Sequence, residues 1–523
     1  MEPSATTNKK QFIIHTLVYG VGGVLAQLVP FILFPLYTNY LRPDEYGVLD
    51  IITQIAEFIN IALMVSGIRI AALTFFRQAE SEEERKRVAV TISIMLWLMV
   101  AFCIFIAVFF AGAIDSFLRI GNPSLLAFGL SVALLNTLIG VPMALTQARL
   151  ESLRFVITNL TMLISRLLLC IYFVVGLEMG IWGVLWSQGI IAVIFGILLT
   201  WRELRIGSFK PDLSKIREVF DFCWPFLPGG ILYFAYSNTD RYFILNYGPY
   251  ATETATLAAL GLYALARRLQ GFVKTICVTP LSQVWAVTMY DIWKRPDAAV
   301  IFGNFAFRMA LVNTFGVFGV CLFAPEIIMV LSDPSYHQAI PIVLPVFIQP
   351  LFVVMNTFME HIFYVSRKTR YKPLINLMTL PVICLLMYIC VPRWGVTGAA
   401  YALLIAIIVT MLLNYCFTQR FFYVRYPYTR FVMLYFITGV CYFGGTLFGN
   451  GILPYELAEE MSKWDRIPLL IEHLALVPWL WKTAFVVLWM TVVWQSRILI
   501  QDDKEMVRNF LVKIKKKVFR NAS

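Results

Sequence analysis

Five positively charged side chains lie deep inside long apolar stretches of this sequence: Arg166, Arg267, Arg268, Lys274 and Arg308. Each such charge costs about 2.5–3.5 kcal/mol at the centre of a membrane helix, so these residues usually face water, a partner or a ligand. Guanidinium and ammonium groups bind phosphate oxygens well. The set therefore predicts a cationic binding site for an anionic headgroup such as a pyrophosphate. Arg69 and Lys482 lie nearer the ends of apolar stretches, where we expect them to extend to the interface.

Polar side chains also follow one face of two segments. Steps of three and four residues place five polar groups on one helical stripe, namely Asp50, Thr53, Gln54, Glu57 and Asn60. Arg267, Gly271 and Lys274 share a face of a later segment in the same way. We expect both stripes to line a central cavity, while the alternative is a set of salt bridges that fix helix packing.

Acidic residues suggest where ion coupling takes place. Asp50 and Glu57 are candidates for carrying a coupling proton or Na⁺. Asp240 and Arg241 form an adjacent ion pair that either gates the cavity or pairs only locally. A coupling H⁺ or Na⁺ is the one cofactor-like ion that the sequence predicts.

The sequence contains no motif that indicates an enzyme. HExxH, GxxxxGK[ST] and a Ser/His/Asp arrangement are absent, and none of the nine cysteines forms a CxxC pair. We therefore predict no catalytic residue and no metal site.

The composition indicates which elements must position these charges. Hydrophobic residues make up 59% of the 523 residues, charged residues only 14%, and the mean hydropathy is +0.75, whereas soluble chains carry roughly 25% charged residues. Stretches of about 20 apolar residues, the length of a membrane span, recur throughout. The sequence predicts an all-α integral membrane protein with about 14 transmembrane helices. They are expected near 12–40, 44–72, 87–111, 123–148, 153–176, 180–201, 223–247, 257–287, 298–324, 339–365, 372–391, 395–418, 428–448 and 475–497.

The distribution of lysine and arginine predicts the topology. With a cytoplasmic N-terminus, 30 of these residues fall in cytoplasmic segments and five in the opposite loops. This alternation follows the positive-inside rule and places both termini in the cytoplasm. It also explains the net charge of +12 without nucleic acid as a partner.

Weak internal similarity predicts two pseudo-symmetric six-helix lobes. Trp182 and Trp394 each precede Gly-Val at an offset of 212, and Gly47 matches Gly261 at an offset of 214. Six spans per half imply a parallel repeat, with the pseudo-axis along the membrane normal. The predicted parts are an N-lobe at 1–205, an amphipathic linker helix at 206–222, a C-lobe at 223–420, two further helices with an external loop at 421–500, and a basic cytoplasmic tail at 501–523.

Three stretches resemble one known family. Residues 41–47 (LRPDEYG), 240–245 (DRYFIL) and 260–266 (LGLYALA) are similar to the corresponding parts of polysaccharide flippases. The chain thus resembles the polysaccharide-transporter branch of the multidrug/oligosaccharidyl-lipid/polysaccharide (MOP) superfamily, which includes O-antigen flippases. The resemblance covers about residues 10–420.

The resemblance implies a function. Members move a polyprenyl-pyrophosphate-linked oligosaccharide from the cytoplasmic to the periplasmic leaflet of a bacterial inner membrane by alternating access. Membrane lipids, and a polymerase and chain-length regulator of the same pathway, are the partners expected with such a substrate. A lipid II flippase or another exporter of the superfamily is the alternative, and a membrane polysaccharide polymerase is the weakest one.

Overall fold

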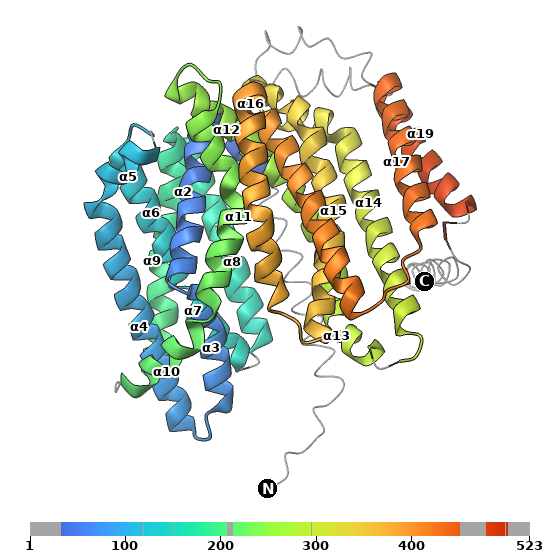
Figure 1. Ribbon diagram of the computed structural model, residues 1–523. Coiled ribbons are helices and arrows are strands. Elements are labelled where there is room, and N and C mark those ends of the chain that lie inside the picture. Colours follow the sequence, from blue (N-terminus) through green and yellow to red (C-terminus); the bar gives the residue numbers. More distant parts are fainter. Residues whose placement is uncertain are drawn as a thin grey trace, which may run out of the picture. The chain divides into compact units, whose positions relative to one another are not determined.

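The computed structural model describes residues 33–118, 120–149, 151–206, 213–293, 295–449, 477–496 and 498–499 (Figure 1). Every regular element in these ranges is a helix and none is a strand, which confirms the predicted all-α membrane fold. In the described part of the chain, eight helices are long and apolar enough to cross a membrane, or nine if one bent pair counts as a span. The total of 14 stays a prediction. Most of the first predicted span, the external loop and the basic tail lie outside the described residues.

The chain forms two compact units, and most helices belong to one unit only. The first contains α2 (Pro43–Ala62), α3 (Val65–Gln78), α4 (Glu82–Phe109), α5 (Ala111–Leu118), α6 (Pro123–Thr137), α7 (Gly140–Ala148), α8 (Ser152–Cys170), the π-helix η1 (Ile171–Gly176), α9 (Gly180–Ile206), α10 (Leu213–Cys223) and α11 (Phe226–Tyr247). α10 is the helix predicted in the linker. The division into lobes at residues 206–222 stays a prediction.

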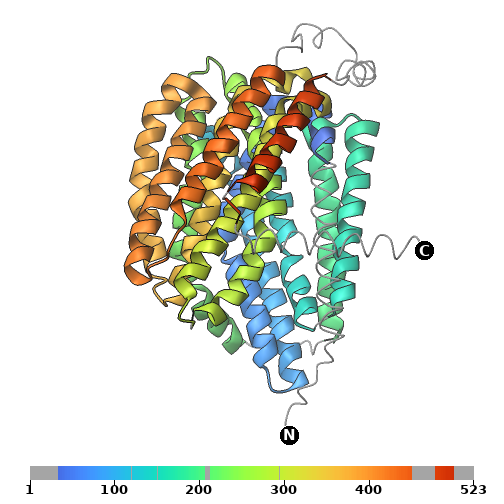
Figure 2. The ribbon, with the colours of Figure 1, turned by 90° about the vertical axis from the view of Figure 1, so that its right-hand side faces the viewer.

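The second unit contains η2 (Lys274–Val278, a π-helix), α13 (Thr279–Ile292), α14 (Ala298–Leu331), the 3₁₀-helix η3 (Pro334–Ala339), α15 (Ile340–Val365), α17 (Tyr428–Gly449) and α19 (Val477–Gln495). Two helices contribute to both units. α12 (Glu253–Val273) begins in the first unit and ends in the second, while α16 (Tyr371–Phe421) gives residues 376–403 to the first and its two ends to the second. Figure 2 shows α17 and α19 running side by side.

Local sequence explains where several helices begin. Pro43 opens α2, and the Glu45 carboxylate accepts a hydrogen bond from the backbone N–H of Arg42 at 3.0 Å. Ser81 caps α4 by accepting from the backbone N–H of Glu84 at 3.1 Å. Asn122 caps α6 in the same way. These caps satisfy the backbone donors that a helix leaves free at its first turn.

One helix break lies inside a predicted span and another lies between two predicted spans. The predicted span 44–72 consists of α2 and α3, which meet at a 48° bend where Met64 adopts a φ of 53°. The predicted spans 372–391 and 395–418 are parts of α16, which breaks at Gly395 with a φ of 54°. The Tyr250 hydroxyl accepts a hydrogen bond from the Val396 backbone N–H at 3.0 Å and so supports this break. A glycine fits at Gly395 because side chains disfavour a positive φ.

α2 and α12 cross at two glycines within the first unit. A Cβ on Gly47 would lie 2.1 Å from the Leu257 carbonyl oxygen, and a Cβ on Gly261 would lie 1.9 Å from the Pro43 carbonyl oxygen. Each glycine also faces the backbone nitrogen of the other. Only residues without a side chain permit this approach, so the glycines that the repeat offset pairs in sequence also pack together.

One prediction about membrane charges is wrong. Lys482 of α19 does not extend to the interface: its side chain is 0% exposed and forms an ion pair with Glu326 of α14. The pair lies beside apolar residues of α14, α17 and α19 that include Phe318, Leu322 and Trp489. A buried cation needs an anionic partner because water cannot solvate it. Nothing in the sequence near Lys482 indicates a partner 156 residues away.

Candidate functional site

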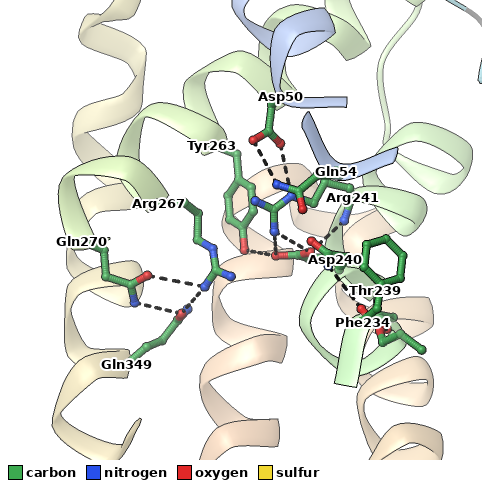
Figure 3. Close-up of polar contacts among 12 residues, drawn as sticks. Asp50, Gln54, Phe234, Thr239, Asp240, Arg241, Tyr263, Arg267, Gln270 and Gln349 are labelled. Atoms are coloured by element: carbon green, nitrogen blue, oxygen red, sulfur yellow. Dashed lines mark hydrogen bonds and ion pairs between the residues drawn. The ribbon is translucent and has the colours of Figure 1, made fainter. Parts of the chain in front are cut away.

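Four side chains from three helices form a charged cluster in the first unit (Figure 3). Arg241 of α11 donates from Nε to the Asp50 carboxylate of α2 at 3.1 Å, and from Nη1 to both oxygens of Asp240 at 3.0 and 3.1 Å. The Tyr263 hydroxyl of α12 donates to Asp240 at 2.7 Å. We call Asp50, Asp240, Arg241 and Tyr263 the α11 charge cluster.

The α11 charge cluster is buried and carries more acid than base. The side chains of Asp240, Arg241 and Asp50 are 1%, 10% and 15% exposed. Two carboxylates face one guanidinium, so the cluster has a net charge of −1 when both are ionised. Uncompensated charge is expensive away from water. Within these four side chains the acidic charges thus outnumber the basic ones by one.

The sequence predicted only part of this cluster. The Asp240–Arg241 ion pair is confirmed. The contact between Arg241 and Asp50 was missed, since it joins residues 191 positions apart and depends on how α2 and α11 pack. Tyr263 was missed for the same reason. The sequence left two roles open for the polar stripes, lining a cavity or forming salt bridges between helices. Arg241 of α11 and Asp50 of α2 form such a salt bridge. The role of Arg241 in coupling or gating stays a prediction.

Arg267 has a different environment in the second unit. Its Nη1 donates to the Gln349 amide oxygen at 3.1 Å and to the Gln270 amide oxygen at 3.4 Å (Figure 3). Gln270 in turn donates to the Val346 carbonyl at 2.8 Å. No carboxylate of the described residues forms an ion pair with Arg267. Among the described residues its contacts are therefore neutral dipoles, and no described salt bridge explains its place.

The other predicted site residues are distributed over both units. Half-buried Arg166 lies on α8 of the first unit, and its Nε has no hydrogen-bond partner in the described part of the chain. Arg268 and Arg308 are half-buried on α12 and α14, and Lys274 is exposed at the start of η2. Exposed Glu57 lies on α2 without a described ion pair. A single site that contains all five cations stays a prediction.

The described residues contain no group of three or more His, Cys, Asp or Glu side chains arranged to hold a metal ion. Besides the α11 charge cluster, the described charged groups form pairs such as Lys482–Glu326 and small networks. In one network Arg202 contacts both Glu203, which it shares with Arg149, and Glu151, which it shares with Arg154.

Solved structures with a similar fold are membrane transporters. The lipid II flippase MurJ in an inward closed conformation is 12% identical, with a TM-score of 0.63 over 90% of this chain and 98% of that one. An inward-facing multidrug resistance MATE family transporter of the MOP superfamily is 14% identical, with a TM-score of 0.57 over 75% of this chain and 94% of that one. A MOP superfamily transporter from Pyrococcus furiosus, described as having a binding pocket of reverse polarity, is 14% identical, with a TM-score of 0.52 over 79% and 95%. No curated protein sequence matches the chain.

These likenesses define a class: the chain is a multi-pass α-helical membrane protein with the fold of MOP-superfamily transporters. Residues 14–292, more than half of the chain, match the family described as polysaccharide biosynthesis protein. The chain belongs to that family, which confirms the resemblance seen in its sequence.

Proposed function

We propose that this protein is a flippase that moves a polyprenyl-pyrophosphate-linked oligosaccharide from the cytoplasmic to the periplasmic leaflet by alternating access. The observation that carries the proposal is the family match over residues 14–292 in a chain with a transporter fold. Polysaccharide assembly needs such a step because a pyrophosphate and several sugars cannot cross hydrocarbon unaided. The repeat unit of an O-antigen, a capsule or an exopolysaccharide is the proposed cargo, and the bacterial inner membrane the proposed location.

Arg267 supports a substrate that carries phosphate. A guanidinium whose partners are amide oxygens keeps its full charge and the N–H donors that phosphate oxygens accept. Arg268, Lys274 and Arg308 add positive charge to the same unit. In this proposal the pyrophosphate is the group that these cations bind.

The α11 charge cluster supports ion coupling. Its excess carboxylate takes up H⁺ or Na⁺ in the proposed antiport cycle, and Arg241 is the group whose contacts change when it does. A pathway polymerase and a chain-length regulator are the proposed protein partners that use the flipped lipid.

A lipid II flippase is the second candidate. The fold likeness to MurJ covers 90% of this chain and favours it, while the polysaccharide biosynthesis family favours the first candidate. The two substrates share a polyprenyl pyrophosphate and differ in the glycan, so they are separated by which lipid-linked product a deletion strain accumulates.

The test is a deletion strain with a leaflet assay for lipid-linked glycan. Without the protein, the lipid-linked oligosaccharide should stay in the cytoplasmic leaflet, and the wild-type gene should restore its transfer. Arg267→Gln should reduce transfer at least about tenfold, because a charge-assisted hydrogen bond to phosphate is worth about 1.5–3 kcal/mol. Arg295→Gln is the matched control, since Arg295 is exposed and paired with Asp297. Normal transfer in the deletion strain would refute the proposal.

A further inference from the structure

A pocket of about 600 Å³ opens among helices of the first unit, apart from the α11 charge cluster. Helices α2, α3, α6, α7 and α11 all contribute to its wall. Its volume falls within the range of about 300–1,000 Å³ that is typical of small-molecule sites. The pocket lies at the bend between α2 and α3, and Met64 at the bend is part of the wall.

The polar wall of this pocket offers both hydrogen-bond acceptors and donors. Glu57 provides a carboxylate without an ion pair in the described part of the chain. The Asn60 Oδ1 is buried and has no hydrogen-bond partner there. Asn136 donates one N–H to the Val132 carbonyl at 3.0 Å, and Thr137 donates its hydroxyl to the Leu134 carbonyl at 2.7 Å. The Asn136 Oδ1, its second N–H and the Thr137 oxygen are therefore left for a ligand. An unsatisfied buried acceptor costs free energy until a donor reaches it.

A donor and an aromatic ring complete the wall. Arg69 lies in the wall and makes no described ion pair, and its aliphatic part packs beside Gly140. The Tyr233 side chain is 51% exposed, so its ring is open to a ligand. Aromatic side chains combine an apolar face with a polar tip. A matching ligand carries several hydroxyl donors around a compact ring, with an apolar face for Tyr233 and an oxygen acceptor for Arg69.

We infer that this pocket binds one sugar residue of the transported glycan. A pyranose has the required set of groups: hydroxyls that donate to the acceptors, oxygens that accept from Arg69, and C–H groups that contact Tyr233. A cationic drug would use Glu57 but leave the amide acceptors without donors. The inference rests on the proposed function for the source of the sugar, and it assigns glycan recognition to the first unit.

Two adjacent glycines of α11 provide a matched pair of variants. Gly230 is part of the pocket wall, and a Cβ added there would lie 2.8 Å from Ile61, another wall residue. Gly229 has nothing within 4 Å of an added Cβ and is not a wall residue. Gly230→Leu therefore places a side chain in the pocket. Gly229→Leu is the matched control, since it makes the same substitution at the neighbouring position outside the pocket wall. Asn60→Leu removes the unpartnered acceptor and keeps the number and branching of the side-chain heavy atoms.

The experiment measures sugar binding directly. The full chain is placed in lipid nanodiscs, because maltoside detergents carry sugars themselves. Saturation-transfer-difference NMR is recorded with the methyl glycosides of glucose, galactose, N-acetylglucosamine and glucuronic acid as probes. We expect transfer to at least one probe in wild type and Gly229→Leu. In Gly230→Leu and Asn60→Leu it should fall at least about fivefold, the loss expected for one good hydrogen bond. Equal transfer in Gly230→Leu and wild type, or no transfer to any probe, would overturn the inference.

The leaflet assay separates this inference from the proposed function. If the wild-type gene restores glycan transfer while Gly230→Leu keeps wild-type sugar binding, the flippase proposal stands and the pocket assignment fails. If the deletion leaves transfer unchanged but Gly230→Leu loses sugar binding, the pocket assignment stands and the flippase proposal fails. Size-exclusion profiles of the nanodisc samples show whether each variant has folded.

Discussion

Replacing Arg241 by leucine should destabilise the first unit more than any single carboxylate substitution in the α11 charge cluster. The leucine removes the ion pairs to Asp50 and Asp240, and with them the guanidinium that faces both buried carboxylates. Asp240 is only 1% exposed, and its remaining hydrogen bonds include those from the Tyr263 hydroxyl and from the backbone N–H at position 241, which carry no charge. Removing one partner of a buried ion pair costs about 3–5 kcal/mol, so we expect a loss of that size in the free energy of unfolding.

Neutralising the carboxylates should recover most of that loss. Asp50→Asn alone keeps the Arg241–Asp240 pair and an amide oxygen near Arg241, so we expect a cost of about 1 kcal/mol. The triple variant Asp50→Asn/Asp240→Asn/Arg241→Leu contains no uncompensated charge. It should be more stable than Arg241→Leu alone, by about 2 kcal/mol, because contacting residues are not additive.

The free energy of unfolding can be measured by SDS titration in mixed micelles. Arg295→Leu is the control, since its ion pair with Asp297 is exposed and should contribute at most about 1 kcal/mol. A cost below about 1 kcal/mol for Arg241→Leu, with additive effects in the triple variant, would refute the description of the cluster as a buried, interdependent set.

Two further predictions concern packing and a buried charge. Gly47→Ala and Gly261→Ala should each destabilise the protein by about 1–3 kcal/mol or more, and by similar amounts. The reason is that each added Cβ would clash with main-chain atoms, which cannot rotate out of the way as a side chain can. Gly439→Ala is the control in the same SDS titration and should be tolerated, because open space surrounds that position. Unequal costs at the two glycines would contradict the reciprocal crossing. Lys482→Met should destabilise by about 3–5 kcal/mol because it leaves Glu326 buried and unpaired. Adding Glu326→Gln should restore much of that loss, and no recovery would show that the two side chains do not depend on each other.

Hydropathy predicted where most helices lie but not where they break. The apolar runs that predicted spans at 87–111 and 428–448 correspond to α4 and α17. The bend at Met64 was missed, because a positive φ at a residue other than glycine has no signature in apolar periodicity. Gly395 was placed at a boundary between spans, and its positive φ breaks α16 there.

The charged contacts show the same limit. Adjacent residues such as Asp240 and Arg241 share a local geometry that sequence can express. Asp50 reaches Arg241, and Glu326 reaches Lys482, through helix packing over 191 and 156 positions of sequence. The sequence placed both Arg241 and Lys482 within apolar stretches, but Lys482 was expected to extend to the interface. It did not identify their partners, because the partner is fixed by tertiary structure.

The glycine crossing of α2 and α12 follows the offset of the predicted sequence repeat. Pro43 and Leu257 are separated by the same 214 positions as Gly47 and Gly261. Gly47 faces the Leu257 carbonyl, and Gly261 faces the Pro43 carbonyl, so the two contacts are equivalent. This exchange of identical contacts is the mark of an isologous interface in a homodimer, here contained in a single polypeptide. The local two-fold axis must pass between the two glycines. Neither Gly47 nor Gly261 can be replaced by a residue with a side chain, because the backbone of the other helix occupies the space that the side chain would fill.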